Sequence, residues 1–345
     1  GDQRQADAQV FFLAQQMWVS GEMYKRRCDL LGFVNGIPLV FVELKGPHVP
    51  LKSAYDDNLK DYKGQSIPQL FHPNAFILLS NGSQTRVGTL TSPWEHFFEW
   101  RRIDDETEAG STSLETAIRG LCDKRRLLDL VENFTVFETA RGGLIKKVAK
   151  NHQYLGVNKA ITQMVKLRES GDREAAKKLG VFWHTQGSGK SLTMVFLVRK
   201  MRADAQLRRF KVIVVTDRKD LQRQLSATAT LTGEVVEVAD SAAGVKALAR
   251  RKGPGLVFAT IQKYRDGDTA DDAPLKAEDL PKVQEPEPRR GYRAKETFEV
   301  LNEDDSILVL VDEAHRTQAG DLHASLLAGL PNCARIGFTG TPIIM

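Results

Sequence analysis

One short segment constrains the fold more than any other: a glycine-rich loop between an apolar run and a helix-like run. The apolar run is Val181–Trp183, the loop is His184–Ser191 and the helix-like run is Leu192–Lys200. Such a strand–loop–helix is typical of a phosphate site, because glycines let backbone N–H groups turn inward and the helix N-terminus attracts negative charge. Lys190 suits the outer phosphates of a nucleotide, and the Ser191 hydroxyl suits Mg²⁺. The residues expected to bind the nucleotide are Thr185, Gln186, Gly187, Ser188, Gly189, Lys190 and Ser191.

The loop departs from the usual pattern in one place, since His184 stands where that motif begins with glycine. The change removes none of the groups that would contact phosphate. The alternative interpretation is a glycine-rich turn with a purely structural role.

A second run strengthens the nucleotide interpretation. Ile307–Val311 is apolar and is followed by Asp312-Glu313-Ala314-His315. Ligands bind at the carboxyl ends of strands in parallel sheets. We therefore expect Asp312 to hold Mg²⁺ and Glu313 to orient or deprotonate the attacking water. Together with the loop, this pair predicts an NTPase.

Helical stretches alternate with apolar, mostly β-branched runs from about residue 151 onward, which favours a parallel sheet with helices on both faces. The stretch 266–305 is rich in proline and charge and is expected to be mostly a mobile surface insertion. The runs expected to be strands of this sheet are Val181–Trp183, Lys211–Thr216, Leu256–Thr260, Ile307–Val311 and Arg335–Phe338.

The motifs of this half resemble those of superfamily 2 helicases and translocases, in the same order along the chain. The resemblance implies a RecA-like lobe of an ATP-driven motor that tracks duplex DNA through phosphate contacts. Gln153 looks like the adenine-reading residue of such motors, although a polar residue at a helix start is an equal alternative. The residues implicated in DNA contact or in coupling are Thr216, Arg218, Thr260, His315, Thr339, Gly340 and Thr341.

The first third of the chain carries a candidate acid pair. Asp29 precedes the sequence Glu43-Leu44-Lys45, and alternate residues of a strand share a face, so Glu43 and Lys45 project together. Two carboxylates near a lysine can bind Mg²⁺, polarise a phosphodiester and generate hydroxide. The alternative is an edge strand with solvated charges. The other runs expected to be strands in this part are Leu31–Val34, Leu39–Glu43, Ala75–Ser80 and Thr85–Leu90.

The turn before Glu43 decides whether Asp29 belongs to the site. Asn35–Gly36 predicts a hairpin. A plain two-residue loop would place Asp29 opposite Val42 and away from Glu43. A three-residue loop would pair Asp29 with Phe41 and bring it to the Glu43 face. We therefore predict an odd-length loop or a bulge, with the turn glycine in the left-handed region.

The stretch from Cys28 to Lys45 resembles the nuclease signature of the R subunits of type I restriction enzymes, a PD-(D/E)xK domain, with Cys28 where the signature usually has proline. That family also carries a Gln-x-x-x-Tyr helix beside the nuclease site. Asn58 and Tyr62 keep this spacing and would share a helix face, with Asn in place of Gln. The alternative for Tyr62 is a packing residue. Other segments that fit the family are Phe71–His72, Ser80–Gly82 and Arg86–Gly88.

The resemblance implies an α/β architecture with three parts: a PD-(D/E)xK endonuclease domain with a mixed sheet at 1–105, a helical linker at 106–150 and the first RecA-like motor lobe at 151–345. It implies ATP and Mg²⁺ as cofactors, unmethylated duplex DNA as substrate, and methyltransferase and specificity subunits as partners. Since the second motor lobe is absent from the sequence, we expect little ATPase activity from this chain alone. Two alternatives remain: a repair or remodelling translocase with an inert nuclease-like domain, and a non-catalytic DNA-binding or assembly module.

Composition adds limits to this interpretation. The length of 345 residues favours two domains, and a net charge of +5 is compatible with nucleic acid but too small to indicate it alone. No apolar run is long enough to span a bilayer, so no membrane partner is expected. Cys28, Cys122 and Cys333 are far apart in the sequence, which argues against disulfides and a cysteine zinc site and favours a reducing cytoplasm. The resemblance implies that this is the cytoplasm of a bacterium or archaeon.

Overall fold

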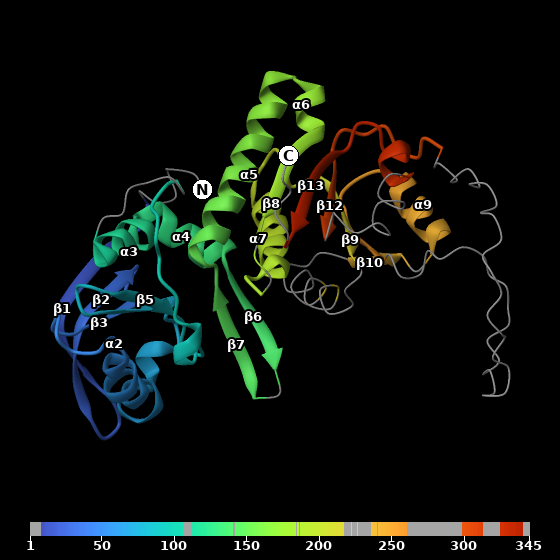
Figure 1. Cartoon of the computed structure of the whole chain (residues 1–345). Helices are drawn as coiled ribbons and strands as arrows, with labels where there is room; N and C mark the ends of the chain where they lie inside the picture. Colours follow the sequence, from blue (N-terminus) through green and yellow to red (C-terminus); the bar gives the residue numbers. More distant parts are fainter. Residues whose placement is uncertain are drawn as a thin grey trace, which may run out of the picture. The chain divides into compact units, whose positions relative to one another are not determined.

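The computed structural model describes residues 8–105, 112–140, 142–183, 185, 187–216, 222, 226, 236–239, 241–260, 299–312 and 325–340. The chain divides into two compact units, which are described separately. Figure 1 labels their helices and strands. The first unit comprises Gly1–Leu179, Gln186–Arg209 and Arg223–Val235. The second unit comprises Gly180–Thr185, Phe210–Gln222 and Val236–Met345.

A five-stranded mixed sheet opens the first unit, with its strands in sequence order. Neighbouring strands are antiparallel except for the third and fourth, which are parallel. The mixed sheet predicted for this part is therefore confirmed. The strands are β1 (Phe11–Ser20), β2 (Lys25–Val34), β3 (Ile37–Leu44), β4 (Phe76–Ser80) and β5 (Thr85–Gly88).

A helical crossover joins the two parallel strands, as parallel pairing requires. The crossover buries Leu59, Tyr62 and Ile67 in one core cluster with Phe41 and Leu79 of the sheet. Two of its segments are π-helical, a rare geometry that is often found at functional sites. Its segments are α2 (Leu51–Ser53), η1 (Ala54–Leu59), η2 (Tyr62–Ser66) and η3 (Pro68–Phe71).

The predicted linker is helical only in its first half, because the segment after Phe134 forms a β-hairpin. The hairpin is bound to the nuclease part: Thr89 Oγ1 donates to Lys146 O at 2.8 Å, and Lys146 N donates to Thr91 Oγ1 at 2.8 Å. The Gly142-Gly143 pair at its turn is the sequence signal for this hairpin, and Gly143 has a φ of +117°. The remaining elements of this unit are η4 (Trp94–His96), α3 (Ser113–Cys122), α4 (Lys124–Asn133), β6 (Thr135–Ala140), β7 (Gly143–Val148), α5 (Asn151–Ser170), α6 (Arg173–Lys177) and α7 (Lys190–Ala203).

A six-stranded sheet forms the framework of the second unit, in the order β10-β11-β9-β12-β13-β8. The pairs β10–β11, β11–β9, β9–β12 and β12–β13 are parallel, which confirms the predicted parallel sheet. Its central strands are buried along their whole length. The elements are β8 (Lys178–Trp183), β9 (Lys211–Thr216), β10 (Val236–Ala239), α9 (Ala242–Arg250), β11 (Gly255–Thr260), β12 (Ile307–Asp312) and β13 (Ala334–Thr339).

No helix among the described residues is long and apolar enough to cross a membrane. Most of the predicted insertion at 266–305 lies outside the described residues.

Candidate active sites

The hairpin formed by β2 and β3 turns at Asn35 and Gly36, whose φ values are +51° and +81°. Val34 pairs with Ile37, so the loop has two residues, but the register then shifts by one beside Gly32. This is the predicted bulge, with the turn glycine left-handed as expected; the three-residue loop was not formed.

The bulge brings the predicted acids to one face of the sheet. Beyond it Leu30 pairs with Val42, so the next residues, Asp29 and Glu43, come opposite each other rather than Asp29 opposite Phe41. Directly opposed residues of an antiparallel pair share a face. Burial is the main cause of the raised pKa of Glu43, and the charge of Asp29 adds to it.

Asp29 is held from both neighbouring strands. Its Oδ2 accepts a hydrogen bond from Leu44 N at 2.8 Å, and its Oδ1 accepts one from Gln16 Nε2 at 3.0 Å. Gln16 belongs to β1 and was missed by sequence reasoning. Its signal in the sequence is weak: two glutamines interrupt the apolar run of β1.

Glu43 is 3% exposed, and its Oε1 accepts a hydrogen bond from Lys45 Nζ at 2.9 Å. The other oxygen, Oε2, is buried and has no hydrogen-bond partner among the described residues. A buried carboxylate oxygen without a partner is costly. A divalent cation would satisfy it, so this atom supports the predicted metal site.

The number of acidic side chains at this site also suits the predicted Mg²⁺ ion. Among the described residues, no three histidine, cysteine or acidic side chains gather in one metal-binding group. Mg²⁺ does not need three, because it is usually bound by one or two carboxylates and completes its shell with water and substrate phosphates. Asp29 and Glu43 meet that requirement.

Burial sets the electrostatics of this site. Burial raises the pKa of Glu43 above its usual range, while the hydrogen bond and charge of Lys45 act in the opposite direction. Burial, with the charges of Glu43 and Asp29, raises the pKa of Cys28 to about 12. The thiol beside the acids is therefore protonated at neutral pH and is a poor metal ligand.

The predicted Asn58 and Tyr62 pair lies beside the acids. Asn58 Nδ2 donates to the Tyr62 hydroxyl at 3.2 Å. Burial raises the pKa of Tyr62, and the charges of Glu43 and Asp29 add to this effect. The Tyr62 ring also packs edge-on against Phe41 at 6.1 Å. The packing interpretation of Tyr62 is confirmed by this contact and by its burial. Its supporting role at the nuclease site stays a prediction.

The phosphate loop leads into α7, which begins at Lys190. Gly187 and Gly189 have φ values of +81° and +97°, a region that only glycine adopts without strain. The loop therefore turns where its glycines were predicted to allow it, and Lys190 and Ser191 occupy the first turn of the helix, where an anion is favoured.

Gln153 supports this loop from α5. Its Nε2 donates to Gly189 O at 3.0 Å and its Oε1 accepts from Lys150 N at 2.8 Å. The helix-start interpretation of Gln153 is confirmed by the second bond. A Cβ at Gly189 would lie 2.8 Å from Gln153 Nε2, so the amide packs directly on the loop. Its adenine-reading role stays a prediction.

Asp312 ends β12 at the carboxyl edge of the second unit's sheet, the edge predicted for a nucleotide site. Thr216, at the end of the adjacent β9, donates its hydroxyl to Asp312 Oδ2 at 3.2 Å, and both side chains are buried. Thr260 pairs with Thr216, and Phe338 pairs with Asp312, so Thr260 and the chain at Thr339 end at the same edge.

Thr216 is 0% exposed in this structure, and its part in DNA contact or coupling stays a prediction. Thr339 is also buried, and Gly340 follows it directly. The predicted residues Gln186, Arg218, Glu313, His315 and Thr341 lie outside the described residues, as does the side chain of Thr260.

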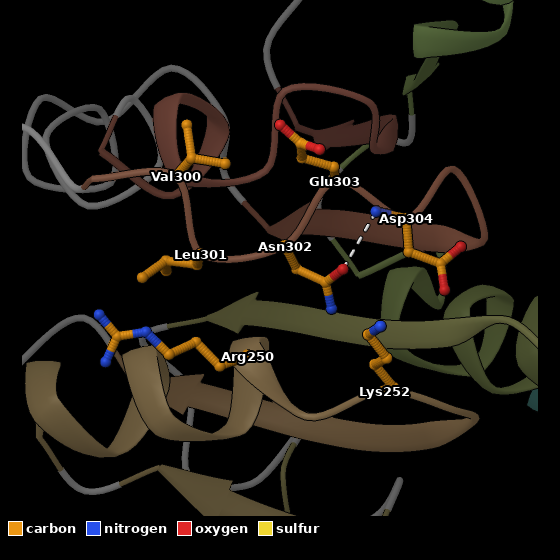
Figure 2. A pocket seen from close by; sticks show the side chains of 7 residues that line it. All are labelled: Arg250, Lys252, Val300, Leu301, Asn302, Glu303 and Asp304. Atoms are coloured by element: carbon orange, nitrogen blue, oxygen red, sulfur yellow. Dashed lines mark hydrogen bonds between the residues drawn. The ribbon is translucent and has the colours of Figure 1, made fainter.

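A separate pocket lies at the opposite edge of this sheet, just before β11 and β12 begin. Figure 2 shows cationic and acidic side chains around it and the 3.0 Å bond from Asp304 N to Asn302 Oδ1. The pocket is therefore distinct from the candidate nucleotide site at Asp312, which lies at the other end of β12. It is lined by Arg250, Lys252, Val300, Leu301, Asn302, Glu303 and Asp304.

Comparison with known protein families finds a match for each half of the chain. Residues 152–345 match the SWI2/SNF2 ATPase family, and residues 2–96 match the N-terminal domain family of type I restriction enzyme R proteins. The chain is 35% identical over 345 residues to the type I restriction enzyme HindI endonuclease subunit of Haemophilus influenzae, covering 92% of this chain and 30% of that protein.

A putative type I restriction enzyme MjaIXP endonuclease subunit of Methanocaldococcus jannaschii is 30% identical over 339 residues, covering 92% of this chain and 29% of that protein. The chain thus spans about 30% of the length of these relatives. An R-protein N-terminal domain precedes a SWI2/SNF2 ATPase domain, and the chain therefore belongs to the R subunits of type I restriction enzymes.

Proposed function

We propose that this chain supplies the nuclease and the first motor lobe of a type I restriction–modification enzyme, which cleaves unmethylated duplex DNA with Mg²⁺ and moves DNA by hydrolysing ATP. The observation that carries the nuclease half is the buried Oε2 of Glu43, opposite Asp29 and without a hydrogen-bond partner among the described residues. The proposed division is 1–105 nuclease, 106–150 linker and 151–345 motor lobe.

Asp29 and Glu43 would hold the metal of the nuclease. When bound, Mg²⁺ would polarise the scissile phosphodiester and favour hydroxide formation. Lys45 neutralises Glu43 through their 2.9 Å contact, and an ammonium group has further protons to donate to a DNA phosphate. Tyr62 and Asn58 would orient this site from the crossover.

The motor half would bind ATP through the backbone of its glycine loop. Lys190 would contact the outer phosphates, and Ser191 and Asp312 would hold the accompanying Mg²⁺. Glu313 would orient the attacking water. Because Thr216 donates to Asp312, we propose that it also positions that acid. Coupling and DNA roles are proposed for Thr216, Arg218, Thr260, His315, Thr339, Gly340 and Thr341.

The partners follow from the family and not from any surface of this chain. We propose that methyltransferase and specificity subunits recognise the target, while this chain contacts duplex DNA through its phosphate backbone. Nothing among the described residues reads base sequence in this proposal.

The experiment is reconstitution of the complete complex, with unmethylated circular DNA, ATP and Mg²⁺. Lys45→Ala should abolish cleavage and leave ATP hydrolysis intact, whereas Lys190→Ala should abolish both. Cleavage that survives in Lys45→Ala would favour a translocase with an inert nuclease-like domain. Undiminished translocation by Lys190→Ala would exclude a motor driven at this loop.

A further inference from the structure

We propose that Gln16 is a positioning residue of the nuclease site, whose amide fixes the Asp29 carboxylate for binding a divalent cation. This inference rests on the proposed nuclease function and adds a residue from an edge strand that no sequence motif indicated.

The first observation is the contact itself. Gln15 pairs with Leu30 and Met17 pairs with Cys28, so Gln16 and Asp29 lie between these two pairs of the β1–β2 ladder. Gln16 Nε2 donates to Asp29 Oδ1 at 3.0 Å. Because Leu44 N holds the other oxygen from β3, the Asp29 carboxylate is oriented by one donor from each neighbouring strand.

The second observation is the backbone of Gln16. Its φ is +51° in the middle of a strand, where extended backbone is the rule. Among the described residues only one other non-glycine residue has a positive φ, and that residue, Asn35, sits in a turn that favours it. Glutamine has no such preference, so the conformation is strained.

Strain of this kind persists only where the surroundings impose it, and it gathers at functional sites. Packing does not impose it here, since Gln16 is exposed. The side-chain contact that Gln16 makes in this conformation is the hydrogen bond to Asp29. A donor that orients a metal-binding carboxylate typically changes metal affinity when it is removed.

The test uses Gln16→Gly, because glycine accepts the positive φ and removes the amide. Mn²⁺ binding to the purified chain, followed by electron paramagnetic resonance of the free ion, should weaken about 10- to 100-fold. The thermal unfolding midpoint should stay the same or rise, since strain is relieved. Gln15→Ala, the exposed neighbour, is the matched control and should change neither quantity.

In the complete complex, Gln16→Gly should raise the Mg²⁺ concentration needed for half-maximal cleavage while saturating Mg²⁺ restores most of the rate. Glu43→Ala tests the metal site itself, independently of the role of Gln16. If Glu43→Ala weakens Mn²⁺ binding and Gln16→Gly does not, the role of Gln16 is overturned alone. If Glu43→Ala has no effect on Mn²⁺ binding, the metal site fails and this inference fails with it. A lower unfolding midpoint in Gln16→Gly with unchanged Mn²⁺ binding would also overturn it.

Discussion

The two candidate sites differ in the kind of structure that positions their functional groups. In the nuclease part the acids stand on strands, and their meeting depends on the register of β2 against β3. In the phosphate loop the groups are backbone amides at the start of α7, and their geometry depends on two glycines and on a glutamine from α5. A strand site therefore depends on pairing, whereas a loop site depends on backbone freedom and on the anchoring of one helix.

The anchoring also differs. Toward its C-terminal end, α7 is tied to α4 by a buried ion pair between Lys200 and Asp129, and Asp129 also accepts from Asn133 Nδ2 at 2.8 Å. Near the nuclease acids, the Arg26–Asp61 pair is about one-third exposed on each side. Buried and exposed pairs respond very differently when one partner is removed.

The largest effect is expected from Asp129→Ala, which leaves the Lys200 ammonium buried without its carboxylate. We expect a loss of about 3–5 kcal/mol in the free energy of unfolding. Chemical denaturation followed by circular dichroism measures it. Arg26→Ala is the matched surface change and should cost at most about 1 kcal/mol.

The double variant Asp129→Leu with Lys200→Met sharpens this result. Replacing both charges with apolar groups should recover most of the stability, because the buried charge is no longer stranded. Equal losses of unfolding free energy in Asp129→Ala and Arg26→Ala would contradict the distinction between the buried and the exposed ion pair.

A smaller effect is expected from Gly189→Ala. The new Cβ would be forced into a left-handed backbone and would lie 2.8 Å from Gln153 Nε2. We expect about 1–3 kcal/mol of loop strain, which corresponds to roughly 5- to 150-fold weaker nucleotide binding. Binding of a fluorescent ATP analogue measures it.

Gly187→Ala is the control for this prediction. It has a positive φ as well, but a Cβ there would meet no atom of the described residues within 4 Å. Its effect should be smaller than that of Gly189→Ala, and the reverse order would show that contact with Gln153 does not shape the loop.

The smallest effect concerns pH. The folded pKa of Glu43 lies above its ordinary value of 4.5, so the folded chain binds the proton more tightly than the unfolded chain does. Stability without divalent ions should therefore fall as pH rises from about 4.5 through the folded pKa. Glu43→Gln lacks this titration, and the stability difference between the two proteins should change over that range. A constant difference would contradict the burial of this carboxylate as a charged group.

Local patterns predicted most of the strands but not all of them. The sequence pattern found β9 with its bounds and parts of the other central strands, because β-branched runs there are continuous. It missed β1, because Gln15 and Gln16 interrupt the apolar pattern of this strand. The strand is held by pairing with β2, which its own sequence does not reveal. It also missed β10, a strand of only four residues, and the hairpin of β6 and β7.

The sites divide in the same way. The glycines of the phosphate loop and the shared face of Asp29 and Glu43 were predictable from spacing. The choice between a bulge and a longer loop was not, because both give the required face. Neither the burial of Thr216 nor the contact of Gln16 with Asp29 was predictable, because each depends on neighbours distant in the sequence.

The bulge residue also bears on how relatives of this chain should be aligned. Leu39 is the residue of β3 that has no partner in β2, between Pro38 and Val40. A chain that lacked it could keep every pairing of the present hairpin with a plain two-residue turn, and its two acids would still lie opposite each other. Two spacings along the sequence therefore describe one arrangement in space. A motif search with a single fixed gap between the aspartate and the glutamate would discard proteins that carry the same site.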